Sequence, residues 1–338
     1  METKKTYVIA EAGANHNRNF KQALELIDAA RMSGADAVKF QTYSSETLYS
    51  KHTEDFAMYK NIPELIKSIE LPREWQPELK SYCDDVGIEF MSTPFDERAV
   101  DELCKVGVSK FKIGAFEATD PRFVRHVALT GLPLIISVGV GGDVDMANKI
   151  VDWVSSANPS VDLTLLHCNS SYPTPIPDIN LGQMSAIKSA TIMTRAVKVG
   201  LSDHTEGILI PPIAVALGAE CIEKHFTLDR GLTGPDHSFA IEPDELIEMV
   251  HNIRLVESSI GRKDDKYTGS EMEFKPAMRS VVCSRNLKSG NLVSVKDITT
   301  KRPFCDGHIP AIEYYSVVGK RLLVDKLADE QILWSDLE

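Results

Sequence analysis

Residues 7–42 read YVIAEAG (Tyr7–Gly13), NFKQALELIDAARMS (Asn19–Ser33) and AVKFQT (Ala37–Thr42), with short loops between them. The first and third stretches are apolar runs of strand length, whereas the middle stretch places apolar residues at helical spacing. Gly34 follows the helical stretch directly, which is the usual signal for a helix end. A strand, a helix and a second strand in this order indicate a parallel βα unit.

The same unit recurs along the chain. Because eight such units over roughly 260 residues are what a TIM barrel requires, the sequence predicts an α/β fold with a (β/α)₈ barrel. The other six expected strands are Ile88–Pro94, Phe111–Phe116, Leu134–Gly139, Leu163–Asn169, Lys198–His204 and Cys221–Thr227.

A change of composition follows the last expected helix, Pro243–Ile260. Residues 261–276 are charged, contain two glycines and lack an apolar period, which is typical of a linker. Short strands and turns are expected beyond it. The sequence therefore predicts a barrel domain over 1–260, a linker over 261–276 and a small C-terminal domain over 277–338.

Composition limits the partners. The chain has 338 residues, 43% hydrophobic and 25% charged, and a net charge of -12, which argues against nucleic acid or an anionic membrane as a partner. No apolar run reaches the roughly 20 residues needed to span a bilayer, and the first residues do not resemble a secretory leader. We therefore expect a cytoplasmic protein. Its six cysteines lack metal-finger spacing and are expected to be buried thiols.

Polar side chains gather near the carboxyl ends of the expected strands. In TIM barrels the active site is built at this end, so their placement favours catalysis over chance. The residues are Glu11, Lys39, Gln41, Thr93, Lys112, Glu117, Ser137, His204, Glu223 and His225.

Two histidines, His204 and His225, end adjacent expected strands. Paired imidazoles can bind one divalent ion and leave coordination positions open. Glu223 lies on the same side of its strand as His225. The alternative is that each histidine is a hydrogen-bonded core residue or a proton shuttle.

Two lysines, Lys39 and Lys112, stand inside apolar strands, where lysine is rare. Three interpretations are open. The lysines could bind a phosphate and a carboxylate of an anionic substrate, one of them could form a Schiff base, or both could extend to the barrel rim without a catalytic role. Glu11 and Glu117 are carboxylates at the barrel mouth that can orient a hydroxyl or a lysine, or act as a base.

Seven motifs, in the order of the family, together resemble the sialic acid synthases. They are IAEAGANH (9–16), VKFQT (38–42), FKIG (111–114), YPTP (172–175), GLSDHT (200–205), IEKHF (222–226) and GPDH (234–237). The end of the chain, with RSVV (279–282) and KRP (301–303), resembles the antifreeze-like (SAF) domain that these synthases carry at their C-terminus.

The resemblance implies condensation of phosphoenolpyruvate with an open-chain N-acyl amino sugar such as N-acetylmannosamine, which releases phosphate. It implies a divalent ion, Mn²⁺ before Mg²⁺ or Co²⁺, held by His204 and His225. Arg302 matches an arginine given to a neighbouring subunit's site, which implies a domain-swapped homodimer. The positions matched around phosphoenolpyruvate and the reacting centre are Glu11, Lys39, Gln41, Thr93, Lys112, Ser137 and Ser202. Those matched near the amino sugar are Glu117, Tyr172, Glu223 and Asp236.

Three positions depart from the family pattern. Ala115 replaces a frequent phosphate-binding serine, and Ser170 replaces a frequent asparagine. Phe116 is more similar to the pseudaminic acid branch, whereas GPDH is more similar to the sialic and legionaminic branches. A legionaminic or pseudaminic acid synthase that uses a 2,4-diacetamido-trideoxyhexose is therefore the alternative. A Schiff-base aldolase and a non-catalytic sugar- or ice-binding protein are the remaining rivals.

Overall fold

The chain folds into two compact units, Met1–Ile260 and Gly261–Glu338. The computed structural model describes residues 5–50, 52–54, 60–191, 195–260 and 267–338. The division between the units falls at the start of the predicted linker, of which residues 261–266 lie outside the described residues. The rest of that linker contains a helical turn, α11 (Gly269–Met272), and the start of a second, η4 (Lys275–Ala277).

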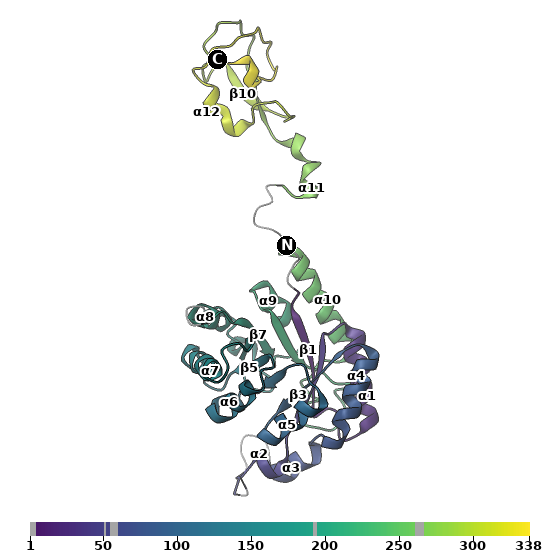
Figure 1. Ribbon diagram of the computed structural model, residues 1–338. Coiled ribbons are helices and arrows are strands. Elements are labelled where there is room, and N and C mark those ends of the chain that lie inside the picture. Colours follow the sequence, from purple (N-terminus) through teal and green to yellow (C-terminus); the bar gives the residue numbers. More distant parts are fainter. Residues whose placement is uncertain (1–4, 51, 55–59, 192–194, 261–266) are drawn as a thin grey trace. The chain divides into compact units, whose positions relative to one another are not determined.

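The first unit is built on eight parallel strands in the order β3-β2-β1-β8-β7-β6-β5-β4. The end strands of this order, β3 and β4, also contact each other, so the sheet comes close to closing into a barrel (Figure 1). The predicted TIM-barrel class is therefore confirmed. The strands are β1 Tyr7–Gly13, β2 Ala37–Thr42, β3 Glu89–Pro94, β4 Phe111–Ile113, β5 Leu134–Val138, β6 Leu163–Cys168, β7 Lys198–Asp203 and β8 Cys221–His225.

Helices surround this sheet on its outer side (Figure 1). Local sequence sets their ends: the side chain of Asn19 caps the first turn of α1, and Gly34 ends this helix at φ 79°. The helices are α1 Phe20–Ser33, α2 Ser45–Leu48, α3 Ile62–Ile69, α4 Gln76–Val86, α5 Glu97–Val106, α6 Pro121–Leu129, α7 Val144–Ala157, α8 Gly182–Thr191, α9 Ile210–Ala216 and α10 Pro243–Ser259, with single 3₁₀ turns η1 Arg73–Trp75, η2 Glu117–Thr119 and η3 Ile176–Asp178.

Two layers of side chains fill the inside of the barrel. Alternate residues of a strand face the same side, so a step of two residues moves from one layer to the next. The lower layer is apolar and consists of Ile9, Ala37, Met91, Ile135, Leu166 and Cys221. Two residues further along the same strands the layer becomes polar, with Glu11, Lys39, Thr93, Ser137, Cys168 and Glu223. The barrel thus sets its polar residues at the carboxyl ends of the strands.

Neighbouring strands are joined by a side-chain cluster at their amino ends and by a close backbone approach at Gly200. At the amino ends of the strands, Lys110 before β4 lies 2.6 Å from a Glu89 oxygen on β3, and Tyr7 of β1 donates to the same oxygen. In β7, a Cβ placed on Gly200 would lie 2.0 Å from the carbonyl oxygen of Cys221 in β8. Only glycine therefore lets these two strands approach so closely.

The second unit has its own small apolar core. The antiparallel pair β9 (Ser280–Cys283) and β10 (Ile298–Lys301) is followed by short elements only, η5 (Ala311–Glu313), α12 (Tyr314–Val317) and η6 (Trp334–Asp336). Its core is formed by Val281, Cys283, Leu287, Val293, Ile298, Ile309, Val317, Leu322 and Ile332. This agrees with the small module of strands and turns expected from the sequence.

Several local expectations need correction. The fourth strand was expected to reach Phe116, but β4 stops at Ile113 because the chain turns at Gly114, against which the Glu117 carboxylate lies. The thiols of Cys104 and Cys305 are exposed, so the expectation of buried cysteines was wrong for these two. Among the described helices, none is long and apolar enough to cross a bilayer.

Candidate active site

The polar layer of the barrel is held together around Lys39. Its Nζ lies 2.7 Å from Glu11 Oε2 and 3.6 Å from Glu223 Oε2, and it donates to Thr93 Oγ1 at 2.9 Å. The lysine is only 3% exposed. Burial alone lowers the pKa of Lys39, but the two carboxylates outweigh burial and raise it. Lys39 therefore stays protonated, which does not suit a Schiff-base nucleophile.

Glu223 is the second centre of this layer. One of its oxygens accepts from Ser202 Oγ at 2.8 Å and lies 3.3 Å from Lys112 Nζ. Burial raises the pKa of Glu223, but Lys112 and then Lys39 outweigh it and hold this pKa far below its usual range. Glu223 is thus an ionised carboxylate that pairs with both lysines.

Glu11 differs from Glu223 although the two lie in the same layer. Gln41 Nε2 donates to Glu11 Oε1 at 2.8 Å, and Lys39 pairs with the other oxygen. Burial raises the pKa of Glu11 to about 7, against the opposing effect of Lys39. Two neighbouring carboxylates whose pKa values move apart are a common arrangement for separate acid–base and electrostatic roles.

The two predicted metal ligands lie side by side. The ring centroids of His204 and His225 are 5.4 Å apart. His204 Nδ1 lies 2.7 Å from the carbonyl oxygen of Asn169, and because a carbonyl only accepts, Nδ1 carries the hydrogen and the lone pair lies on Nε2. Burial lowers the pKa of His204 to about 4 and also lowers that of His225. Both rings are therefore neutral at pH 7.

These histidines suit a metal ion. Nδ1 of His225 is buried and has no hydrogen-bond partner among the described residues, and the backbone carbonyl that fixes His204 is a frequent partner of metal-binding imidazoles. In the part of the chain that the structure describes, no group of three or more His, Cys, Asp or Glu side chains surrounds such a position. A divalent ion here would thus complete its coordination with water or substrate oxygens, as catalytic ions do.

Side chains from two loops lie next to the histidines, Tyr172 from the loop after β6 and Asp236 and Phe239 from the loop after β8. The ring centroids of Tyr172 and His204 are 4.2 Å apart, and those of Phe239 and His225 are 5.3 Å apart. A Cβ on Gly13, which has φ +50°, would lie 2.7 Å from Asp236 Oδ2 and 3.3 Å from His225 Cε1. Gly13 therefore allows Asp236 and His225 to approach the end of β1.

Two more predicted residues carry buried polar atoms that lack a hydrogen-bond partner among the described residues. They are Ser137 Oγ at the end of β5 and Glu117 Oε2 in η2. Burial raises the pKa of Glu117, and Lys112 opposes this rise. Because buried polar atoms are normally paired, both positions are suited to contact a ligand.

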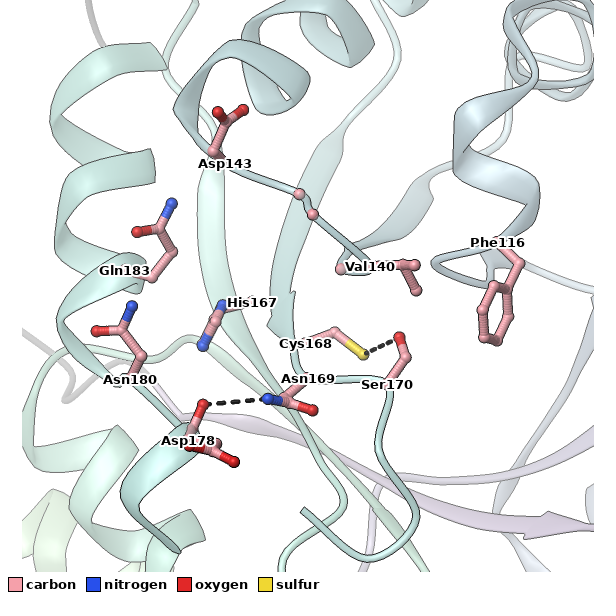
Figure 2. Close-up of a pocket in the computed structure, with 13 residues that line it drawn as sticks. Phe116, Val140, Asp143, His167, Cys168, Asn169, Ser170, Asp178, Asn180 and Gln183 are labelled. Carbon is pink, nitrogen blue, oxygen red and sulfur yellow. Dashed lines mark hydrogen bonds between the residues drawn. The ribbon is translucent and has the colours of Figure 1, made fainter. Parts of the chain in front are cut away.

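A pocket of about 610 Å³ lies where β5 and β6 end and α7 and α8 begin (Figure 2). Phe116 and Val140 at this pocket are 55% and 57% exposed. The three departures from the family pattern meet in this region: Ser170 Oγ and the Ala115 methyl group both lie against Gly139, and Phe116 lines the pocket with Ser170.

Arg302 belongs to the second unit. It is exposed directly after β10, and no hydrogen bond or ion pair to it is found among the described residues. Its predicted contact with a neighbouring subunit stays a prediction. All other predicted site residues lie in the barrel unit.

Comparison with known proteins decides the family. Residues 26–265 match the NeuB family, and residues 278–338 match the SAF domain. The chain belongs to the NeuB family. The expected resemblance and the antifreeze-like C-terminal domain are thereby confirmed.

Individual NeuB-type proteins are similar over nearly the whole chain. An N,N'-diacetyllegionaminic acid synthase of Legionella pneumophila is 39% identical, covering 98% of this chain and 94% of that protein. A pseudaminic acid synthase of Campylobacter jejuni is 36% identical, covering 95% and 94%. The crystal structure of an N-acetylneuraminic acid synthetase from Leptospira borgpetersenii has a TM-score of 0.72 at 34% identity, covering 80% of this chain and 90% of that one.

Membership of the NeuB family confirms the predicted enzyme class, a synthase of the sialic acid type. A purely non-catalytic sugar- or ice-binding protein is therefore not supported. Named relatives include legionaminic and pseudaminic acid synthases, so the specific expectation of N-acetylmannosamine as acceptor is not confirmed.

Three residues that support the site lie outside the set predicted from the sequence. Asn169 supplies the carbonyl that orients His204. Lys224 and Asp203 form a buried ion pair behind the two histidines. A lysine inside an apolar strand was the available signal, and it was applied to Lys39 and Lys112 but not to Lys224.

Proposed function

We propose that this chain is a nonulosonic acid synthase that condenses phosphoenolpyruvate with an open-chain N-acyl amino sugar and releases phosphate. The observation that carries the proposal is the polar layer together with the two neutral histidines beside it, because two lysines, two carboxylates and two imidazoles meet at the carboxyl ends of the strands. Its buried atoms without partners, on Ser137 and Glu117, are available to a substrate.

Lys39 and Lys112 bind the phosphate and the carboxylate of phosphoenolpyruvate in this proposal. In a chain of net charge -12, two buried cations supply the local positive potential that an anionic substrate needs. Thr93 accepts a hydrogen bond from Lys39, whereas Gln41 and Ser202 donate to the two carboxylates. In this proposal these groups and Ser137 add hydrogen bonds to the substrate. Glu223 holds both lysines in place through its ion pairs.

His204 and His225 hold a divalent ion, with Mn²⁺ as the first candidate and Mg²⁺ or Co²⁺ as the others. Such an ion would supply Lewis-acid polarisation of the sugar aldehyde, the carbon to which C3 of phosphoenolpyruvate adds. Tyr172 and Asp236 lie next to the histidines, and with Glu117 they orient the sugar hydroxyl and amide groups in this proposal. Glu11, with a pKa near 7, takes a proton from the water that adds to C2 before phosphate leaves.

A 2,4-diacetamido-trideoxyhexose is the acceptor that we favour over N-acetylmannosamine. The apolar side chains of Phe116 and Val140 at the pocket fit acetamido and deoxy methyl groups better than they fit hydroxyls. The named relatives that make legionaminic and pseudaminic acids support the same class of sugar.

The test measures phosphate release by the full-length protein, stripped with a chelator and reloaded with Mn²⁺. Phosphoenolpyruvate is supplied alone, with N-acetylmannosamine, or with the 2,4-diacetamido-trideoxyhexoses. We expect release only with sugar and metal, fastest with a diacetamido sugar, and a loss of at least about 100-fold in His225→Ala. Full turnover in chelator, or release without sugar, would contradict the proposal. Faster turnover with N-acetylmannosamine would contradict the choice of acceptor.

A further inference from the structure

Lys224 is a buried lysine on β8 that has no role in the proposed reaction. It lies between Glu223 and His225 on β8, faces outward from the barrel and is 1% exposed. Its Nζ lies 2.7 Å from Asp203 Oδ2 and donates also to the carbonyl oxygen of Thr205. A fully buried lysine is costly unless it is paired, so these contacts hold a fixed geometry.

Asp203 extends this contact around His204. Its Oδ1 accepts from the backbone N–H of Thr205 at 3.1 Å and from Thr205 Oγ1 at 2.9 Å. Both side chains of the ion pair therefore hydrogen-bond to Thr205. Because His204 lies between Asp203 and Thr205, these bonds fix the turn that carries the imidazole.

The strand register shows how these bonds affect the positions of both histidines. The last paired residues of β7 and β8 are Asp203 and Lys224. His204 and His225 each follow one residue after this last pair of β7 and β8, although His225 is still paired with Glu11 of β1. On the inner side, Ser202 donates to Glu223 one step before the end. On the outer side, the Lys224–Asp203 ion pair joins the two strands at their last paired residues, one residue before each histidine.

We propose that Lys224 and Asp203 are positioning residues: they form a clamp on the outer side of β7 and β8 that fixes the separation of His204 and His225, and with it the affinity for a divalent ion. This inference rests on the proposed role of the two histidines. Neither clamp side chain touches the ion or the substrates. Their effect passes through the backbone of His204 and His225.

The test measures Mn²⁺ binding by calorimetry on the full-length protein, stripped of metal and free of substrates. Lys224→Met should weaken binding about 10–100-fold, the usual effect of removing a group that orients a metal ligand. Because Lys224→Met leaves Asp203 buried without its cation, the double variant Lys224→Met/Asp203→Leu is measured as well. That variant leaves no unpaired charge, should keep its thermal stability near wild type, and should bind Mn²⁺ as weakly as the single variant.

A geometric readout accompanies the affinity. The visible absorption of bound Co²⁺ reports its coordination, and we expect its bands to shift in the double variant. Lys110→Met is the matched control, because it removes a lysine–carboxylate pair at the opposite end of the barrel. It should lower stability and leave Mn²⁺ affinity and the Co²⁺ spectrum unchanged.

Two results would overturn the inference, and they are distinguishable. Wild-type affinity and spectrum in the clamp variants, with binding lost in His204→Ala and His225→Ala, would refute the clamp and leave the proposed metal site standing. Mn²⁺ binding that is indifferent to the histidine variants would refute both.

Discussion

Lys39 and Lys112 act as cations in our proposal, and the surroundings of Lys39 decide against covalent chemistry there. The ion pairs with Glu11 and Glu223 raise the pKa of Lys39, whereas a Schiff-base lysine needs a lowered one. We predict that Lys39→Met lowers kcat/KM for phosphoenolpyruvate by about one to two decades, the effect of losing one charge-assisted contact, and leaves Mn²⁺ affinity unchanged. Steady-state kinetics with varied phosphoenolpyruvate measure this.

The control for this substitution is Lys80→Met, which removes a lysine from a surface pair with Asp84 on α4. It should leave kcat/KM at the wild-type value. Borohydride treatment of the wild-type enzyme with substrates, followed by mass spectrometry, should give no adduct on Lys39 or Lys112. A stable adduct on either lysine would replace our mechanism with that of an aldolase.

Site residues were predictable from the sequence where residue type and strand position agreed. Lys39, Glu11 and Glu223 were identified because charged residues at strand ends are unusual, and the alternation of a strand places them in one layer. Their protonation was not predictable, because it depends on which carboxylate lies closer to which lysine. Lys224 was missed because its partner, Asp203, becomes a neighbour only through the register of β7 and β8.

The two end strands of the sheet, β3 and β4, are linked by side chains at their amino ends. Lys110 lies 2.6 Å from Glu89, and Tyr7 donates to the same carboxylate. Burial raises the pKa of Glu89, but the hydrogen bonds from Lys110, Ser109 and Tyr7 outweigh it, so that the pKa is lowered. A carboxyl group with a lowered pKa stabilises the fold above its unfolded pKa, near 4.5, and this stabilisation is lost as the pH falls through the folded value.

We therefore predict that Glu89→Gln destabilises the protein by about 1–3 kcal/mol at pH 7. The difference from wild type should begin to shrink below about pH 4.5, where the carboxyl of the unfolded chain takes up a proton, and should disappear once the folded carboxyl is protonated at lower pH. Urea unfolding of both proteins across pH 3–8 measures it. A difference that stays constant over this range would show that the charge of Glu89 is not what ties the two strands.

Element ends were predictable where a glycine or a run of apolar residues marks them. β1 and β2 have the predicted bounds, and α1 ends before Gly34. β4 is shorter than predicted because Gly114 and the carboxylate of Glu117 turn the chain early, and nothing in FKIGAF distinguishes this turn from continued strand. Strand propensity alone does not predict the contact between Gly114 and the Glu117 carboxylate.

At the scale of the whole molecule, we predict a homodimer in which Arg302 of one chain completes the barrel site of the other. Arg302 is exposed in the second unit, and a planar guanidinium suits the polar groups of a sugar. Arg302→Ala should be weakly active alone, as should Lys112→Met. Mixed after unfolding and refolding together, they should recover roughly a quarter of wild-type activity, since about half of randomly paired dimers then hold one intact site.

The control mixes Arg302→Ala with wild type that has been refolded separately, under conditions in which subunits do not exchange. No recovery in heterodimers verified by mass spectrometry would contradict a site shared between subunits. The sequence predicts a division near residue 260 from a change of composition, and the chain passes from one compact unit to the other between Ile260 and Gly261. It carries no comparable signal for how two chains pair, because pairing depends on surfaces that are distant in the sequence.

The close approach at Gly200 restricts how this enzyme can evolve. Any side chain at this position would collide with the Cys221 backbone, push β8 from β7 and separate the histidines that follow them. In a library that randomises β7, selection for activity should thus return glycine at 200. Val199 and Leu201, which pack in the core between the strands and the helices, should accept other apolar residues. Homologous enzymes with altered acceptors should accordingly differ in their loops while this strand pair stays constant.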